Sequence, residues 1–288
     1  MALVGLGMLG LVSPNVVRAF EGTLKLRSIS VERTELGTLV EKPDPSPDAI
    51  FGLGVDKLLA FKGPPVPEID NSTVYIRADQ LRANAPLPDD QTGFVVVDIK
   101  SGTTRIVMPQ AKRYIEWTAA DGGALREQID KTKKRLEAQL ATLPPDQRQQ
   151  AEAMLKEMTA MSEEGPPPVL EPLGTTRVIN GFHTTGYQMR VGDQVTRGWV
   201  TQDLPDLARL YQSAQEKLQN MLPSARRDPR TAIGERGLPV LVQTLGPDRY
   251  RVEELLGVDN KPVAADLFTI PAEFTRTNGL PNAPLGPN

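Results

Sequence analysis

The feature of this sequence that most constrains its fold is a series of short segments in which apolar and polar side chains alternate, separated by tight turns. Residues 93–100 (GFVVVDIK) and Thr103–Met108 (TTRIVM) are joined by Ser101-Gly102, which predicts a hairpin with a two-residue turn. Arg113–Trp117 follows after a further turn. The 26 prolines and 24 glycines among the 288 residues suit many such turns. The pattern predicts an antiparallel sheet whose strands are connected in sequence.

Further strands are predicted on both sides of a helical region. They are expected over residues 20–32, 72–83, 175–180, 182–191, 194–201, 238–245, 249–258 and 261–269. In the first of them Leu24 and Leu26 share one face, whereas Ile29 and Val31 fall on the other. This change of face suggests a bulge or a twist near Ser28.

The helical region is the segment 122–163, in which Ala, Gln, Glu, Lys, Leu and Met dominate and a Pro-Pro pair interrupts the pattern. It predicts an αα-hairpin inserted between strands. An apolar stripe predicts a shorter helix over residues 49–61. Asp203, with Pro205 two residues later, predicts the start of another helix. The fold class expected is therefore α+β, with a curved antiparallel sheet as its main element.

The N-terminus resembles a secretory signal. Ala2–Val12 is an unbroken apolar run, too short for the roughly 20 residues that span a bilayer. Cleavage is expected after Ala19, although no Lys or Arg precedes the run, and a buried N-terminal strand or helix is the alternative. The mature protein would be soluble and periplasmic. A single domain is expected over 20–275, and the tail 276–288, which has no apolar period, is expected to be disordered.

Composition excludes several kinds of chemistry. The chain has no cysteine, so disulfides, thiol nucleophiles and Cys-ligated metals are excluded. Its formal net charge of −3 gives no general attraction for nucleic acid. His183 is the only histidine, and no nucleophile motif accompanies it, so it is interpreted as structural. We expect no catalytic residue, no metal and no cofactor.

Several strings resemble a known bacterial family. They are FEGTLKLRSIS, TVYIRADQLRA and GFVVVDIKSGTTRIVMPQAKRYIEW in the first half, and GTTRVINGFHTTGYQMR, TRGWVTQDLP and ADLFTIPAEFT in the second. In this order they are similar to domain of unknown function 4412, over roughly residues 20–275. That family is similar in turn to periplasmic lipoprotein carriers of the Lol type. The resemblance implies an open half-barrel with helices on its concave side over an apolar cavity, and it implies no functional residues.

Candidate ligand-binding residues are the apolar and aromatic side chains that could line such a cavity. They are Leu24, Leu26, Val74, Ile76, Val95, Val97, Ile106, Met108, Tyr187, Met189 and Trp199. The alternative for these side chains is ordinary core packing, and the same choice applies to Trp117, Tyr75 and Tyr114. A basic cluster at Arg226, Arg227 and Arg230 could contact phospholipid headgroups or an acidic partner, or could complement a helix C-terminus.

Three functions are considered. The first is a non-enzymatic envelope carrier or sensor that binds a lipid, an acyl chain or a lipidated partner. The second is a protein-interaction module in which the hairpin 122–163 docks an envelope partner. The third is a hydrolase assembled from His183 and distant side chains. A nucleic-acid partner is not expected.

Overall fold

The computed structural model describes residues 20–43, 45–63, 66–86, 92–140, 169–221 and 229–277, together with the isolated residues 144, 148, 152 and 155. The described strands are β1 (Gly22–Glu32), β2 (Glu68–Arg77), β3 (Gln80–Pro86), β4 (Thr92–Asp98), β5 (Thr103–Met108), β6 (Arg113–Trp117), β7 (Leu170–Ile179), β8 (Phe182–Val191), β9 (Gln194–Thr201), β10 (Leu238–Leu245), β11 (Arg249–Asp259) and β12 (Thr275–Thr277). The described α-helices are α1 (Leu36–Val40), α2 (Pro47–Phe51), α3 (Val55–Ala60), α4 (Ala119–Leu140), α6 (Pro205–Met221) and α7 (Pro229–Gly234).

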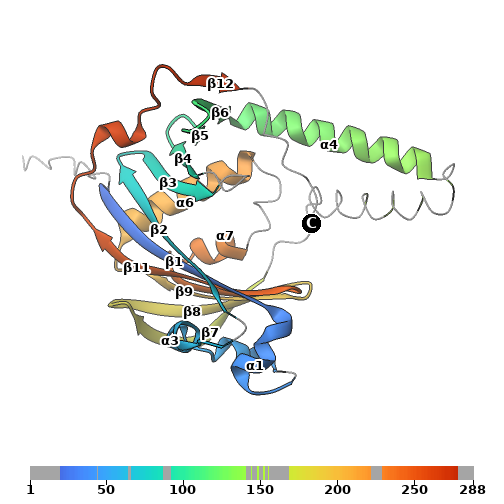
Figure 1. The fold of residues 1–288 in the computed structure, drawn as a ribbon, viewed down its shortest axis with the longest axis vertical. Helices are drawn as coiled ribbons and strands as arrows, with labels where there is room; N and C mark the ends of the chain where they lie inside the picture. Colours follow the sequence, from blue (N-terminus) through green and yellow to red (C-terminus); the bar gives the residue numbers. More distant parts are fainter. Residues whose placement is uncertain are drawn as a thin grey trace, which may run out of the picture.

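These strands form one 12-stranded sheet in the order β12-β6-β5-β4-β3-β2-β1-β11-β10-β9-β8-β7. Neighbours are antiparallel, except that β12 runs parallel to β6. The sheet is open, with β12 at one edge and β7 at the other, and it curves around α6 and α7 (Figure 1). The prediction of a large, curved, mostly antiparallel sheet with helical additions is confirmed.

We call the face that carries α6 and α7 the inner face and the opposite one the outer face. On the inner face, Leu207 and Ala208 of α6 pack with Leu24, Ile76 and Leu255 of the sheet. These contacts hold α6 against β1, β2 and β11, because the burial of apolar side chains is the main favourable free-energy term in folding.

The outer face has a core of its own. Leu36 of α1, Phe51 of α2 and Leu58 of α3 pack there against Ile29 and Val252 of the sheet. The helices therefore cover both faces, whereas the resemblance placed them on the concave side. β1 alternates without interruption between the two cores, so no bulge is present near Ser28; the register shift with β11 lies between Lys25 and Leu26.

Several boundaries differ from the predictions for local reasons. The segment 72–83 is a hairpin, because Ala78 adopts a positive φ of 51° between β2 and β3. The loop between β4 and β5 has four residues, Ile99–Gly102, since Asp98 pairs with Thr103 and its carboxylate accepts the Ser101 N–H at 2.8 Å. The expected helix over 49–61 is divided into α2 and α3.

The C-terminal part also differs. The segment 261–269 contains a 3-10 helix, Ala265–Phe268, in place of the predicted strand. Phe268 and Val263 pack on Val96, so this segment covers the outer face of β4. The tail predicted to begin at 276 starts inside β12, which extends the sheet; residues 278–288 lie outside the described part.

The predicted helical hairpin is represented by α4, which extends away from the sheet in Figure 1. Its N-terminus is held by Thr118 and Asp121, whose carboxylate accepts the Thr118 N–H at 2.7 Å. Most of the second predicted helix lies outside the described residues, as does the signal segment 1–19. Within the described part, no helix has the length and apolar character needed to cross a bilayer.

Candidate functional site

The candidate site is the inner face of the sheet, because the strand registers place most of the predicted ligand-binding residues there. Val74, Ala83, Val95, Ile106 and Ile115 form one row of direct partners across β2 to β6. Partners in adjacent antiparallel strands point to the same side, so these side chains share one face.

A second row connects neighbouring positions of the same strands and also faces inward. Ile76 pairs with Leu81, and Leu81 pairs with Val97. Met108 is outside this row, but it lies two residues beyond Ile106 on β5 and therefore points to the same face. Val95, Val97, Ile106 and Met108 are half-buried and belong to none of the four hydrophobic clusters of the described residues. We call these four side chains the inner apolar surface.

The other predicted residues on the inner face are part of packed clusters. Leu24 and Ile76 are buried under α6, and Leu26 and Val74 pack against the same cluster. Met189 is buried on the inner face of β8. Tyr187 packs near α7 with the cluster of Val200, Ile233 and Val242. These six residues are therefore core residues of the described structure.

Trp199 does not face the inner side. It pairs with Leu241 and Gly186 on the outer face and is 2% exposed within the α1–α3 core. The Arg177 guanidinium lies 4.6 Å from its ring centroid. The structure thus separates Trp199 from the other ten predicted residues, because β9 is buried on both faces and its sequence does not show which face is the inner one. Tyr75 is likewise on the outer face, packed with Phe268 and its neighbours.

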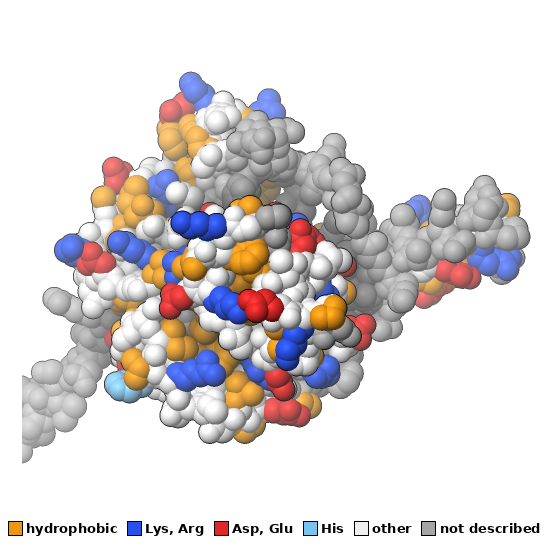
Figure 2. Space-filling view, turned by 60° about the horizontal axis from the view of Figure 1, so that its bottom comes forward, with side chains coloured by type: hydrophobic (Ala, Val, Ile, Leu, Met, Phe, Trp, Pro, Cys, Tyr) orange, Lys and Arg blue, Asp and Glu red, His pale blue; other side chains and the backbone are white. Residues whose placement is uncertain are grey.

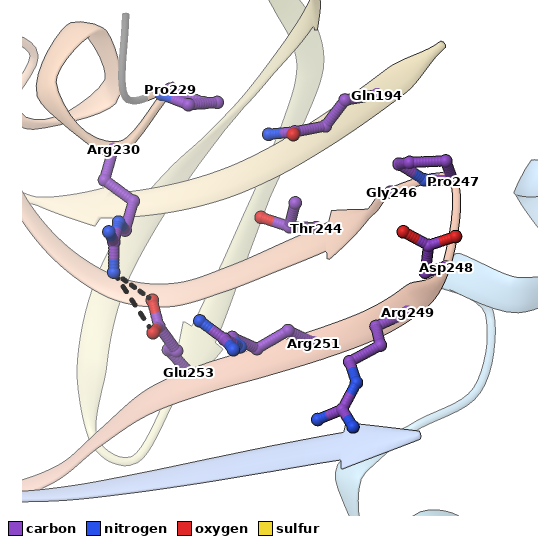
Figure 3. Close-up of a pocket in the computed structure, with 10 residues that line it drawn as sticks. All are labelled: Gln194, Pro229, Arg230, Thr244, Gly246, Pro247, Asp248, Arg249, Arg251 and Glu253. Carbon is purple, nitrogen blue, oxygen red and sulfur yellow. Dashed lines mark hydrogen bonds and ion pairs between the residues drawn. The ribbon is translucent and has the colours of Figure 1, made fainter. Parts of the chain in front are cut away.

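A second feature of the inner face is a pocket of about 490 Å³, open to solvent, where β9, β10 and β11 meet the start of α7. Figure 3 shows Gln194, Thr244 and Arg251 extending from three adjacent strands, with Arg230 entering from α7. Asp248 lies at the turn between β10 and β11. Seven of its ten lining residues are polar or charged, in contrast to the inner apolar surface.

Most cations of this pocket are neutralised. Arg230 of α7 forms an ion pair with Glu253 at 3.3 Å. Arg249 contacts Glu32 at 2.6 Å and Glu68 at 3.0 Å. The sequence predicted that Arg230 contacts a headgroup or partner, or complements a helix C-terminus. In the structure its ion pair with Glu253 connects α7 to β11. Arg226 and Arg227 lie outside the described residues.

His183 lies in a different depression, of about 550 Å³, on β7 to β9. Its Nδ1 is 3.4 Å from Asp203, which also accepts the His183 backbone N–H at 2.9 Å instead of serving as the predicted helix cap. That backbone hydrogen bond is the main cause of the lowered pKa of Asp203. The neighbouring Thr184 hydroxyl donates to the Arg177 carbonyl, so it is not directed at the imidazole. Among the described residues, no hydrogen bond joins the His183 imidazole to a hydroxyl group, although Thr176 and Thr185 line the same depression.

The described residues contain no group of three His, Asp or Glu side chains arranged to hold a metal ion. On the side of the molecule shown in Figure 2, Lys and Arg side chains are interspersed with Asp and Glu, and hydrophobic side chains lie between them. Such mixed charge does not form the continuous basic stripe that a nucleic acid backbone needs.

The polar pocket was not identified from the sequence. Its residues come from separate strands, and none belongs to a recognisable motif. One signal was present: a hairpin closed by Gly246-Pro247-Asp248 pairs Thr244 with Arg251, which places both on one face.

A family model described as a domain of unknown function, DUF4412, matches residues 129–274. The match begins after the first-half strings that suggested the same family. No curated protein matches the chain. Among solved structures, one described as "Structure of PNGF-II in C2 space group" is similar at a TM-score of 0.35 and 11% identity, over 86% of this chain and 29% of that chain. The chain thus spans less than a third of that structure's length.

Proposed function

The chain belongs to the DUF4412 family, a domain of unknown function, and we propose that it is a non-enzymatic binding protein of the cell envelope. In this proposal it holds an alkyl chain, from a lipid or a lipidated partner, against the inner apolar surface. In this proposal the curved sheet acts as an open half-barrel, as in the Lol-type carriers with which the sequence analysis compared the family. The protein is exported, with residues 1–19 removed as a signal peptide.

The observation that carries the proposal is the inner apolar surface itself. Val95, Val97, Ile106 and Met108 are adjacent across β4 and β5 and remain half-buried. They lie beyond Leu81, the last sheet residue that packs with the α6 cluster. An alkyl chain on this surface would be removed from water, which contributes about 0.8 kcal/mol for each methylene fully buried. Lipid binding is therefore driven by the same term that packs α6 on the neighbouring strands.

The test compares two isoleucines on opposite faces. Ile106→Gln places an amide on the inner apolar surface, where its desolvation costs roughly 1–3 kcal/mol without a partner. We expect the affinity for a fluorescent long-chain fatty acid to fall about tenfold or more. Ile69→Gln is the matched control, because Ile69 is 47% exposed and lies on the outer face of β2. Its affinity should equal that of the unmodified protein.

The same experiment examines export and ligand source. The full chain is recovered from a periplasmic extract, where an intact mass beginning at Phe20 is expected. Lipid extracted from this material is identified by mass spectrometry. Failure of the unmodified protein to bind the probe, together with the absence of any co-purifying lipid, would falsify the lipid-binding proposal. Recovery only in the cytoplasm with residues 1–19 intact would contradict export.

A second candidate function is favoured by the position of α4. This helix of 22 residues extends from the sheet, and among the described elements its main tertiary contact is with α6 (Figure 1). Most of its described side chains are exposed, including Lys131 and Glu127, which form an ion pair at 2.6 Å. We propose as the alternative that α4 is a docking arm for an envelope protein.

Deletion of residues 122–163 tests this alternative. The deletion should abolish crosslinking to an envelope partner while the β-sheet circular dichroism and the fatty-acid affinity stay unchanged. A partner recovered equally well with the shortened chain would exclude α4 as the docking element. Loss of fatty-acid binding alone would instead assign the arm to the lipid site.

A further inference from the structure

A row of polar side chains passes through the polar pocket, and the proposed alkyl-binding function does not use it. Thr196, Thr244, Arg251 and Ser30 are successive direct partners across β9, β10, β11 and β1. All four therefore point to the inner face, at the interstrand spacing of about 4.8 Å. Arg251 occupies the middle of this row, with a hydroxyl residue on each side.

Arg251 is the cation of this pocket that lacks a carboxylate. Its side chain forms neither a hydrogen bond nor an ion pair among the described residues, whereas Arg230 and Arg249 are both paired with carboxylates. Its side chain is exposed in the pocket, between Thr244 and the Arg230–Glu253 pair (Figure 3). A guanidinium group has five N–H donors and no acceptor, so its complement is an oxyanion.

The neighbouring groups add donors to the same place. The Ser30 hydroxyl, on the strand next to Arg251, is buried without a hydrogen-bond partner, but Ser30 is not part of the pocket lining. The Thr244 hydroxyl and the Gln194 amide line the pocket on the other side.

We infer that this pocket binds a phosphate group, with Arg251 as its main ligand and with the Thr244 hydroxyl as a further donor. A phosphate has enough acceptor oxygens to accept from several directions, and its charge matches the unpaired guanidinium. The group is either free inorganic phosphate or the headgroup of a phospholipid. The inference does not depend on the inner apolar surface.

The charge of Asp248 is expected to affect phosphate binding in the opposite direction to the charge of Arg251. Its carboxylate is at the rim of the pocket and has no side-chain partner among the described residues. A carboxylate at this position repels a phosphate, although solvent screens the interaction. Removal of this charge strengthens phosphate binding, while removal of the Arg251 charge weakens it.

The experiment uses the full chain and two probes, inorganic phosphate and dihexanoyl phosphatidic acid below its micelle concentration, by titration calorimetry. Arg251→Gln should weaken binding about tenfold or more, as expected for the loss of a charge-assisted contact. Asp248→Asn should strengthen it. Arg190→Gln, which removes an exposed arginine that faces outward on β8, is the charge-matched control and should have no effect.

The outcomes separate the two sources. Arg251-dependent binding of inorganic phosphate identifies a free-anion site, whereas Arg251-dependent binding of the phosphatidic acid alone identifies a headgroup site. Absence of binding by both probes, or equal binding by Arg251→Gln and Arg190→Gln, overturns the inference. Ile106→Gln should leave phosphate binding intact, so failure here and failure of the alkyl-binding proposal are distinguishable. Unchanged urea midpoints verify that each variant is folded.

Discussion

Replacement of Trp199 by alanine should lower the free energy of unfolding by about 3–5 kcal/mol, the usual cost of truncating a large buried aromatic residue. Trp199 is 2% exposed and packs with Leu241 and the outer-face core. Gly186 leaves room for its indole, since a Cβ at Gly186 would lie 2.9 Å from Nε1. The cavity left by the substitution is enclosed by α1–α3 and the sheet, so it cannot close easily. Urea unfolding followed by circular dichroism measures the change.

Two further variants identify the cause. Trp199→Phe should cost less than alanine, because Nε1 is buried without a partner and phenylalanine removes this unsatisfied donor. Arg177→Gln should cost at most about 1 kcal/mol, the value of an exposed cation–π contact. Fatty-acid affinity should be unchanged in every variant that remains folded. If the Trp199→Ala protein has normal stability but does not bind the fatty-acid probe, Trp199 is a ligand-binding residue and the structural role assigned to it is wrong.

The inner apolar surface could be predicted because hairpins preserve side-chain parity. β4 and β5 are consecutive, so alternation within each strand and one short loop place Val95, Val97, Ile106 and Met108 on the same face. Which face is inward depends on the packing of α6, which joins residues more than a hundred positions apart. Local pattern therefore identifies the set of side chains but not what covers them.

Trp199 shows the limit of the same reasoning. In QVTRGWVT both faces of the strand are buried, with Trp199 on one and Val200 on the other. Periodicity cannot distinguish the inner face from the outer when both are apolar. For the same reason, the two-sided burial of β1 was interpreted as a bulge or a twist near Ser28, whereas the register shift lies between Lys25 and Leu26. The packing of α1–α3 on one face of the sheet shows which of the two buried faces is the outer one.

The strands that form the polar pocket are brought together by both short-range and long-range pairing. Thr244 and Arg251 are brought together by a hairpin that the sequence predicts. β1 is placed beside them by its pairing with β11, across a separation of more than two hundred residues. Arg230 enters from α7, a short helix with no strong sequence signature. Long-range pairing and the docking of a short helix are tertiary events, so local sequence could not reveal this site.

Gly198→Ala should lower the free energy of unfolding by about 1–3 kcal/mol, the typical cost of overpacking a core. Gly198 lies on the inner face of β9 beneath α7. A Cβ there would lie 2.6 Å from Cγ2 of Ile233, which is fully buried. That atom is held close to the backbone by the β-branch and cannot move aside, so α7 itself must shift. Urea unfolding measures the loss.

The displacement of α7 also links this position to the polar pocket, because Arg230 at the start of α7 is paired with Glu253 on β11. Gly257→Ala is the matched control, since a Cβ at Gly257 meets nothing within 4 Å. Its stability should be equal or slightly higher, because alanine restricts the unfolded chain. In a double-mutant cycle, Gly198→Ala should lower the free energy of unfolding much less when Ile233 is already replaced by alanine. Strictly additive effects would show that the clash with Ile233 is not the cause.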